Sequence, residues 1–192
     1  DVEMEAPPPS GGGDPLTGLA ADRAFRAALQ GELRRAKRYG HRVAIAIFDL
    51  DGFAALNTRV TTIVGDRLLR EAAMLLGNKI RDIDLAARPG EDEFSLLLPQ
   101  TDRNGAFLVA ERFRRELESH FRKREAGGQP VDLTVSGGVA AYPDDALDAE
   151  ALGAGEGLDG RQLDAALAGA VGHGPADGVL AGVLEAPGQE QE

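Results

Sequence analysis

The chain has 192 residues, of which 43% are hydrophobic, and a formal net charge of −11 at pH 7. This length accommodates one domain with a packed core and some additional chain at its ends, but no second domain of catalytic size. The chain has no cysteine, which excludes disulfides and thiolate metal sites. No apolar run approaches the roughly 20 residues that a membrane helix requires, so we expect a soluble, cytoplasmic protein without a membrane anchor in this fragment.

The acidic residues are concentrated in the C-terminal part of the chain. From Ala126 onward, Arg161 is the only basic residue against twelve acidic ones, whereas residues 1–125 carry 20 basic and 20 acidic residues. Duplex nucleic acid is recognised by a concentrated basic face that neutralises phosphates. Nucleic acid is therefore not an expected partner.

The chain begins with a segment that has almost nothing to bury. Residues 1–13 combine proline, glycine and acidic residues, which is typical of a linker, and a linker in this place suggests a fragment of something longer. A helix is expected to follow and to run to Gly40, because Phe25, Leu29 and Leu33 recur at helical spacing.

Alternating strands and helices are expected in the middle of the chain. Residues 43–48 form an unbroken apolar run, which predicts a buried strand that ends at Asp49. A second helix is expected to begin near residues 65–66, where leucine and alanine then recur on one face. Residues 94–98 are expected to form the return strand of a hairpin whose turn is residues 90–93.

A third helix and a last strand complete the predicted domain. The helix is expected over residues 106–121 and a central strand over residues 131–140, so that the order is β-α-β-β-α-β. This order describes an α+β sandwich of ferredoxin-like type, with a mostly antiparallel sheet flanked by helices. We expect the domain to span residues 14–180, with a weak helix over residues 164–170, and an acidic, disordered tail over residues 181–192.

Four acidic residues lie at the ends of predicted strands. Asp49 and Asp51 follow the first apolar strand, and Asp92 and Glu93 occupy the hairpin turn that could face them. Carboxylates are costly to bury without a partner, and Mg²⁺ is bound by one or two carboxylates together with substrate phosphates. The alternative is that these residues form turns and are solvated. The residues alone leave both interpretations open.

Five short motifs occur in one order and with a characteristic spacing. They are DPLTGL at 14–19, FDLD at 48–51, GD at 65–66, RPGEDEF at 88–94, and TVSGGVAAYP at 134–143. Together they resemble the GGDEF family of diguanylate cyclases, which join two GTP molecules into cyclic di-GMP across a dimer of domains. The resemblance extends from about residue 14 to about residue 179 and implies the nucleotidyl-cyclase-like form of the sandwich. It also implies a fused or upstream sensor or receiver module.

The resemblance implies a half-site for one GTP and Mg²⁺. Its metal ligands would be the carboxylates of Asp49 and Asp92 and the backbone carbonyl of Leu50. Its guanine-binding residues would be Asn57 and Asp66. Mg²⁺ is expected as a cofactor only if this half-site works.

Several positions around this half-site depart from the family pattern. Glu93 resembles the acid near the attacking 3′-hydroxyl, but Glu91 replaces the second glycine of the motif and Ala54 replaces a lysine. Two later family cations fall at about Val171 and Pro175. Phosphoryl transfer depends on cations that neutralise developing charge, so the departures predict an inactive or very weak cyclase with a vestigial site. If Glu91 instead points into solvent, a slow but working enzyme remains.

An Arg-x-x-Asp pattern precedes the hairpin turn. Arg81 and Asp84 form this pattern, and five residues separate Asp84 from Gly90, which is the register of the family's inhibitory site for cyclic di-GMP. Arg112 resembles the secondary arginine of that site, and Arg88 is a further candidate. A guanidinium can bind a phosphate or a guanine edge in a bidentate manner, and a carboxylate can accept hydrogen bonds from guanine amines.

Other interpretations of these charged residues remain open. Arg81 and Asp84 could form only an exposed ion pair, and the same short pattern also occurs over residues 161–164. The charged run over residues 34–38 is interpreted as a solvated helix face, although it could supply the partner half of a ligand site in a dimer.

The leading hypothesis is therefore a receptor domain that binds cyclic di-GMP, forms a homodimer on binding, and regulates an attached module. The alternatives are an active diguanylate cyclase with product inhibition, a module that binds GTP without turnover, and an interaction domain without a ligand.

Overall fold

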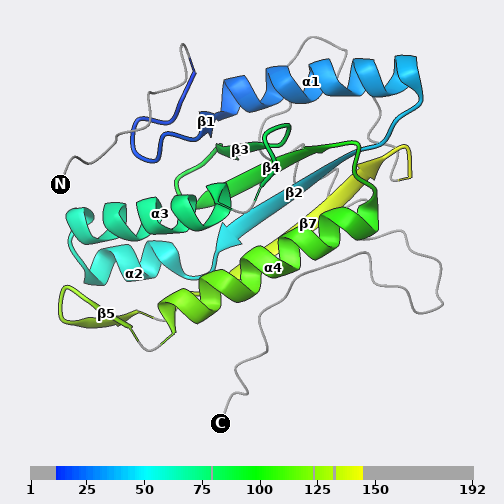
Figure 1. The fold of residues 1–192 in the computed structure, drawn as a ribbon. Helices are drawn as coiled ribbons and strands as arrows, with labels where there is room; N and C mark the ends of the chain where they lie inside the picture. Colours follow the sequence, from blue (N-terminus) through cyan, green and yellow to red (C-terminus); the bar gives the residue numbers. More distant parts are fainter. Residues whose placement is uncertain (1–11, 79, 123, 132, 145–192) are drawn as a thin grey trace, which may run out of the picture.

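The computed structural model describes residues 12–144, apart from residues 79, 123 and 132. A five-stranded mixed sheet forms the centre of the described chain, with the strand order β1-β3-β4-β2-β7 (Figure 1). Its strands are β1 (Ala20–Ala21), β2 (Val43–Leu50), β3 (Leu85–Arg88), β4 (Glu93–Pro99) and β7 (Val135–Tyr142). All neighbouring strands are antiparallel except β1 and β3.

Helices cover both faces of the sheet (Figure 1). They are α1 (Asp22–Tyr39), α2 (Phe53–Arg59), α3 (Thr62–Gly77) and α4 (Arg103–Phe121). The larger apolar cluster joins the sheet to α2, α3 and α4, and the smaller one joins it to α1. Along β2, Ala46 and Phe48 belong to the first cluster and Val43 and Ile45 to the second, which is the alternation expected of a strand buried on both faces.

The predicted α+β ferredoxin-type sandwich is confirmed. The predicted hairpin is formed by β3 and β4, in which Leu85 lies opposite Leu97. The predicted helices correspond to α1, α3 and α4, although α3 begins at Thr62, three residues earlier than expected. The separate short helix α2 was not predicted.

The predicted last strand corresponds to β7. Within the described residues it pairs with β2, and β4 is the middle of the five strands. Val135, Val139 and Ala141 are buried in the larger core cluster. The helix α4 packs on β7, which accounts for the burial of these side chains.

A small hairpin between α4 and β7 was also missed. It consists of β5 (Arg124–Ala126) and β6 (Gln129–Val131), joined by Gly127 and Gly128 with φ of 61° and 74°. Two consecutive positive φ angles are typical of the two-residue turns that connect hairpin strands, and glycine adopts them without strain. The Gly-Gly pair was therefore a readable signal.

Some expectations fall outside the described residues. These are the structure of residues 1–11, the weak helix over residues 164–170 and the acidic tail over residues 181–192. In the described part of the chain, none of the helices has the length and apolar character that a membrane crossing requires.

Candidate functional site

Arg81 and Asp84 lie together in the turn that leads into β3. The Arg81 Nη2 donates to Asp84 Oδ1 at 2.7 Å, and the Arg81 Nε and backbone N–H donate to Oδ2 at 3.1 and 2.8 Å. The Asp84 side chain is 3% exposed, whereas that of Arg81 is 54% exposed. The hydrogen bond to Asp84 raises the pKa of Arg81 above its ordinary value. The nearly buried carboxylate of Asp84 therefore fixes the position of the Arg81 guanidinium.

The loop after β4 holds the same guanidinium from a second side. Arg81 Nη2 also donates to the Pro99 carbonyl at 3.2 Å and to the Thr101 hydroxyl at 2.8 Å, and this hydroxyl donates to Pro99 at 3.0 Å. Nε and Nη2 are thus engaged, and no acceptor among the described residues is recorded for Nη1. A guanidinium carries five N–H groups, so the Nη1 pair is available to an incoming acceptor.

A cavity of about 490 Å³ lies beside this arginine. Its lining residues come from the end of α3, the Arg81 turn, the loop after β4 and α4: Asn78, Ile80, Arg81, Asp84, Thr101, Gly105, Val109 and Arg112. The volume falls within the range of ligand pockets, roughly 300 to 1,000 Å³. Fold topology thus brings together three of the four residues expected to bind cyclic di-GMP, Arg81, Asp84 and Arg112, which are 31 positions apart at most in the sequence.

Arg88 does not line this cavity. Its Nη1 donates to both carboxylate oxygens of Asp14 at 3.2 Å, and its Nη2 donates to the backbone carbonyl of Glu91. Burial alone would raise the pKa of Asp14, but hydrogen bonds from Thr17 and Arg88 lower it below its ordinary value. Arg88 therefore joins the turn before α1 to the β3–β4 turn.

The residues expected to hold Mg²⁺ lie at the other end of the sheet. Asp49 and Glu93 are opposite each other in the β2–β4 register, and the Leu50 backbone N–H donates to the Asp92 carbonyl at 3.1 Å. The carboxylates of Asp49 and Asp92 and the backbone carbonyl of Leu50 suit Mg²⁺ when a nucleotide supplies further oxygen ligands. Within residues 12–144 as described, no group of three or more acidic or histidine side chains forms a metal site by itself. These residues fit Mg²⁺ only together with nucleotide phosphates.

The two expected guanine-binding residues are also brought together. Asn57 lies on α2 and Asp66 on α3, and a Cβ at Gly65 would collide with the Asn57 side-chain amide. The absence of a side chain at Gly65 lets the two helices approach at this point. At the hairpin turn, Glu93 lies over Gly90, where an added Cβ would meet its Oε2 at 2.8 Å.

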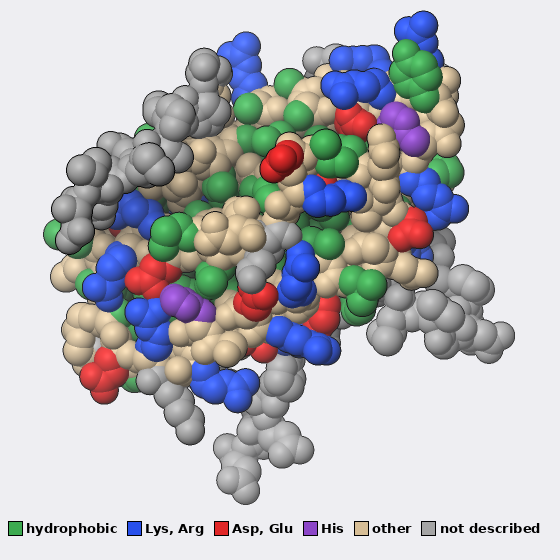
Figure 2. Space-filling model, in the orientation of Figure 1, with side chains coloured by type: hydrophobic (Ala, Val, Ile, Leu, Met, Phe, Trp, Pro, Cys, Tyr) green, Lys and Arg blue, Asp and Glu red, His purple; other side chains and the backbone are tan. Residues whose placement is uncertain are grey.

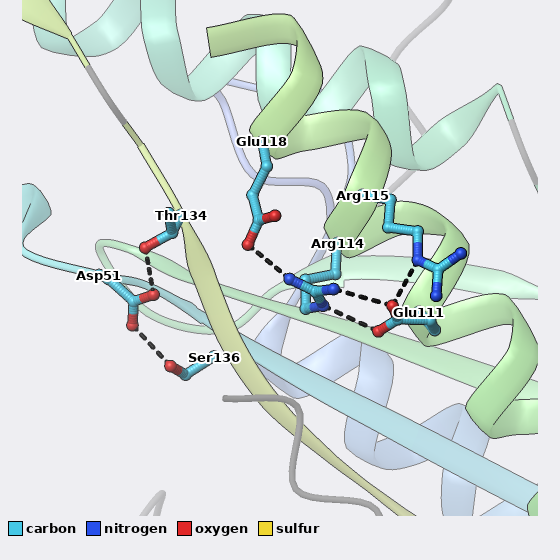
Figure 3. A network of polar contacts seen from close by, with 7 residues as sticks. All are labelled: Asp51, Glu111, Arg114, Arg115, Glu118, Thr134 and Ser136. Atoms are coloured by element: carbon cyan, nitrogen blue, oxygen red, sulfur yellow. Dashed lines mark hydrogen bonds and ion pairs between the residues drawn. The ribbon is translucent and has the colours of Figure 1, made fainter. Parts of the chain in front are cut away.

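Asp51 has a structural role beside this edge. It accepts hydrogen bonds from the Thr134 hydroxyl at 2.6 Å and the Ser136 hydroxyl at 2.7 Å, so that it joins the end of β2 to the start of β7 (Figure 3). Nearby on α4, Arg114 lies between Glu111 and Glu118 at 2.8 and 2.6 Å (Figure 3). The ion pairs, above all with Arg114, lower the pKa of Glu111 to about 2.

A sequence model of a known protein family matches most of this chain. The model described as "Diguanylate cyclase, GGDEF domain" matches residues 12–154. The chain belongs to the GGDEF family. Proteins of this family take part in cyclic di-GMP signalling, and its cyclases use Mg²⁺. The fold agrees with the assignment.

Individual relatives agree with the family match. The diguanylate cyclase DgcP of Pseudomonas aeruginosa is 33% identical over 132 residues, which are 67% of this chain and 19% of DgcP. The structure of diguanylate cyclase SiaD from the same organism, in complex with its activator SiaC, has a TM-score of 0.66 and 33% identity, covering 82% of this chain and 57% of SiaD. The GGDEF domain of DgcB from Caulobacter crescentus, in complex with cyclic di-GMP, has a TM-score of 0.65 and 27% identity, covering 73% and 81%. This chain spans only a fifth of the length of DgcP.

Sequence reasoning missed residues that support the candidate sites. Thr101 and the Pro99 carbonyl hold Arg81, but neither carries a charge or a motif, and they are close to Arg81 only because β3 and β4 pair. The Asp14–Arg88 ion pair joins two motifs that were recognised separately. Its only sequence signal was the opposite charge of the two residues.

Proposed function

We propose that this GGDEF domain is a receptor that binds cyclic di-GMP in the cavity at Arg81, Asp84 and Arg112, and that it has little or no cyclase activity. The observation that carries the proposal is the shared cavity of these three residues, with Arg81 Nη1 left for an acceptor. Cyclic di-GMP offers two phosphates and the acceptor edges of two guanines, which guanidinium groups bind in a bidentate manner.

In this proposal the residues of the cavity have different tasks. Arg81 and Arg112 contact the dinucleotide, because both line the cavity. Asp84 positions Arg81 through its two carboxylate oxygens and needs no ligand contact of its own. Arg88 has no part in binding, since its guanidinium is engaged with Asp14 and the turn carbonyl.

Weak or absent catalysis is supported by the chemistry of the GTP half-site. Ala54 lies exposed in the first turn of α2 and supplies no cation. Glu91 is exposed in the hairpin turn, which is the arrangement expected to leave a slow but working enzyme, so it contributes its charge and not a steric block. Both changes make the edge more negative, where triphosphate and developing charge require cations. Asp49, Leu50 and Asp92 would still hold Mg²⁺ if GTP binds, with Glu93 and the guanine-binding residues Asn57 and Asp66 in place beside them.

The regulatory part of the proposal concerns an attached module. DgcP is about five times longer than the matched region, so relatives carry this domain within longer chains. Occupancy of the cavity would be passed to such a module, and a dinucleotide with two equivalent halves favours the pairing of two domains.

A second candidate function is an active diguanylate cyclase that is inhibited by its product. The observation in its favour is that the half-site residues Asp49, Leu50, Asp92 and Glu93 remain together at one edge of the sheet. DgcP and SiaD, to which this chain is similar, are diguanylate cyclases.

Two measurements on the same preparation separate these functions. Titration calorimetry with cyclic di-GMP should show heat and an affinity better than about 100 μM, equivalent to about −5.5 kcal/mol. Incubation with GTP and Mg²⁺, followed by chromatography, should show no accumulation of cyclic di-GMP. Clear product contradicts inactivity and favours the inhibited cyclase. Binding of GTP without product would indicate a GTP-responsive module. No heat in calorimetric titrations with either cyclic di-GMP or GTP plus Mg²⁺ would indicate an interaction domain.

A further inference from the structure

A dense group of cationic side chains at the end of α1 is not used by the proposed function. Figure 2 shows lysine and arginine side chains gathered over the end of α1. The group, called the α1 basic end below, consists of Arg34, Arg35, Lys37, Arg38 and Arg42, all of them exposed.

Acidic residues of the described chain neutralise only part of this group. Arg35 pairs with the nearly buried Glu32 at 3.0 Å. Within the described residues, no carboxylate is recorded in a pair with Arg34, Lys37 or Arg38. Arg38 instead lies over the ring of its neighbour Tyr39 at 5.3 Å. Cations stabilise the C-terminal turn of a helix, but this effect does not extend to Arg34, which precedes that turn. Arg42 lies beyond the helix, 3.9 Å from Asp102.

The chain returns to the α1 basic end just before its acidic part. β7 pairs with β2 so that Tyr142 lies opposite Val43. Two residues later, Asp144 makes an ion pair with Arg42 at 3.3 Å. Asp144, the last described residue, therefore lies beside Arg42. Residues 145–192 contain ten acidic residues and a single arginine, Arg161.

We propose that the acidic segment of residues 145–192 docks on the α1 basic end of the same chain. The Arg42–Asp144 pair would be the first contact of this interface. Covalent connection gives the segment a high effective concentration at the surface. The segment is long enough to reach all of these cations. A dozen extended residues span about 40 Å, whereas the cations from Arg34 to Arg38 extend over only about 6 Å of the helix.

The docked segment would neutralise the α1 basic end. Attraction between exposed charges is screened by salt, so the interface should open at high ionic strength. A polyanion or an anionic membrane could reach the cations only by displacing the segment. None of the five cations of the α1 basic end lines the cavity at Arg81, although Arg42 lies 3.9 Å from Asp102, the neighbour of the cavity residue Thr101. Docking of the segment does not require that cyclic di-GMP binds.

Zero-length cross-linking of the full chain tests the proposal. A carbodiimide couples lysine amines to neighbouring carboxylates, and the chain has only three lysines, Lys37, Lys79 and Lys123. Peptide mass spectrometry should find Lys37 coupled to carboxylates of residues 145–192 far more often than the other two lysines. The yield should fall at least about threefold in about 1 M NaCl, where the Debye length is about 3 Å.

Matched variants separate the basic end from general charge effects. The double variant Arg34→Gln/Arg38→Gln keeps Lys37 as the reporter and should lower its cross-linking several-fold, with an unchanged circular dichroism spectrum. Arg23→Gln removes an exposed cation near the other end of the same helix and should leave the yield unchanged.

Three outcomes would overturn the proposal. Equal coupling of the three lysines would show that residues 145–192 have no preferred site. In a mixture of ¹⁴N- and ¹⁵N-labelled chains, coupling mainly between chains would assign the surface to a second copy. Sedimentation of the full chain with phosphatidylserine vesicles, without intramolecular coupling of Lys37, would assign it to an anionic membrane.

Discussion

Asp84 holds the guanidinium of Arg81 with both of its carboxylate oxygens while remaining almost completely shielded from solvent. The cation that lines the cavity is therefore held in one orientation through Nε and Nη2, and no acceptor for Nη1 is recorded among the described residues. A preoriented group loses little conformational entropy when a ligand binds. This ion pair is the structural basis of the proposed recognition of cyclic di-GMP.

Replacing Arg81 should weaken the binding of cyclic di-GMP strongly. Hydrogen bonds to a charged group contribute about 1.5 to 3 kcal/mol, so Arg81→Ala should raise the dissociation constant about 10- to 100-fold in calorimetry. Arg115→Ala is a matched control, because Arg115 is 73% exposed, lies on α4 and does not line the cavity. Equal affinities of Arg81→Ala and the unsubstituted chain would place the binding site elsewhere.

Thr101 should act on binding through the position of Arg81. Thr101→Val keeps the shape of the side chain but removes the hydroxyl that accepts from Nη2, and we expect a loss of affinity of about 3- to 10-fold. Thr101→Ser keeps the hydroxyl and should restore most of it. If valine and serine have the same effect, the contribution of Thr101 is packing and not orientation of the guanidinium.

Glu91→Gly should increase the rate of cyclic di-GMP synthesis from GTP and Mg²⁺. The change removes an exposed carboxylate from the turn in which Glu93 lies over Gly90. Adding Ala54→Lys should increase the rate further, since it supplies a cation at the first turn of α2, and a gain of about 10-fold or more is expected. Glu91→Gln, which removes only the charge, separates repulsion from steric hindrance.

A rate that remains undetectable in the double variant would show that the deficiency of the half-site lies in other residues. Gly90→Ala provides the opposite control. Its Cβ would displace the Glu93 carboxylate and should abolish any gain.

The layers of the fold could be predicted from the sequence because each is marked by its own apolar period. The run from Val43 to Phe48 and the helical spacing of Phe25, Leu29 and Leu33 report burial directly. Strand order is different, because it depends on which backbone edges pair. The order β1-β3-β4-β2-β7 of the described strands was therefore not predicted.

Only those residues of the candidate sites that belong to recognisable motifs could be predicted from the sequence. Register in the sequence placed Arg81, Asp84 and Arg112 in one group, and they share a cavity. The contacts of Arg88 with Asp14 and the Glu91 carbonyl depend on the packing of the turn before α1 against the hairpin, which no local pattern encodes. The same holds for Thr101.

Acid should weaken the ion pairs of α4 in a defined pH range. The pKa of Glu111 is lowered from 4.5 to about 2, chiefly by Arg114. Its contribution to stability is thus complete above pH 4.5 and is lost as the pH falls towards 2. A shift of this size corresponds to about 3 kcal/mol, which solvent screening of a partly exposed group reduces to about 1 to 2 kcal/mol.

Urea unfolding at several pH values measures this contribution. Arg114→Met should lower the free energy of unfolding at pH 7, and its difference from the unsubstituted chain should shrink between pH 4.5 and 2. Arg122→Met, which changes an exposed residue beyond the end of α4, should show a pH-independent difference. A constant difference for Arg114→Met would contradict the assigned role of Glu111.

A crystal structure of the full chain grown with cyclic di-GMP tests the central claim most directly. We predict a phosphate or guanine oxygen within about 3.2 Å of Arg81 Nη1, a second contact from Arg112, and Asp84 still bonded to Arg81. A dinucleotide bound only at the edge formed by Asp49 and Asp92, or a cavity at Arg81 that contains only water, would contradict the account.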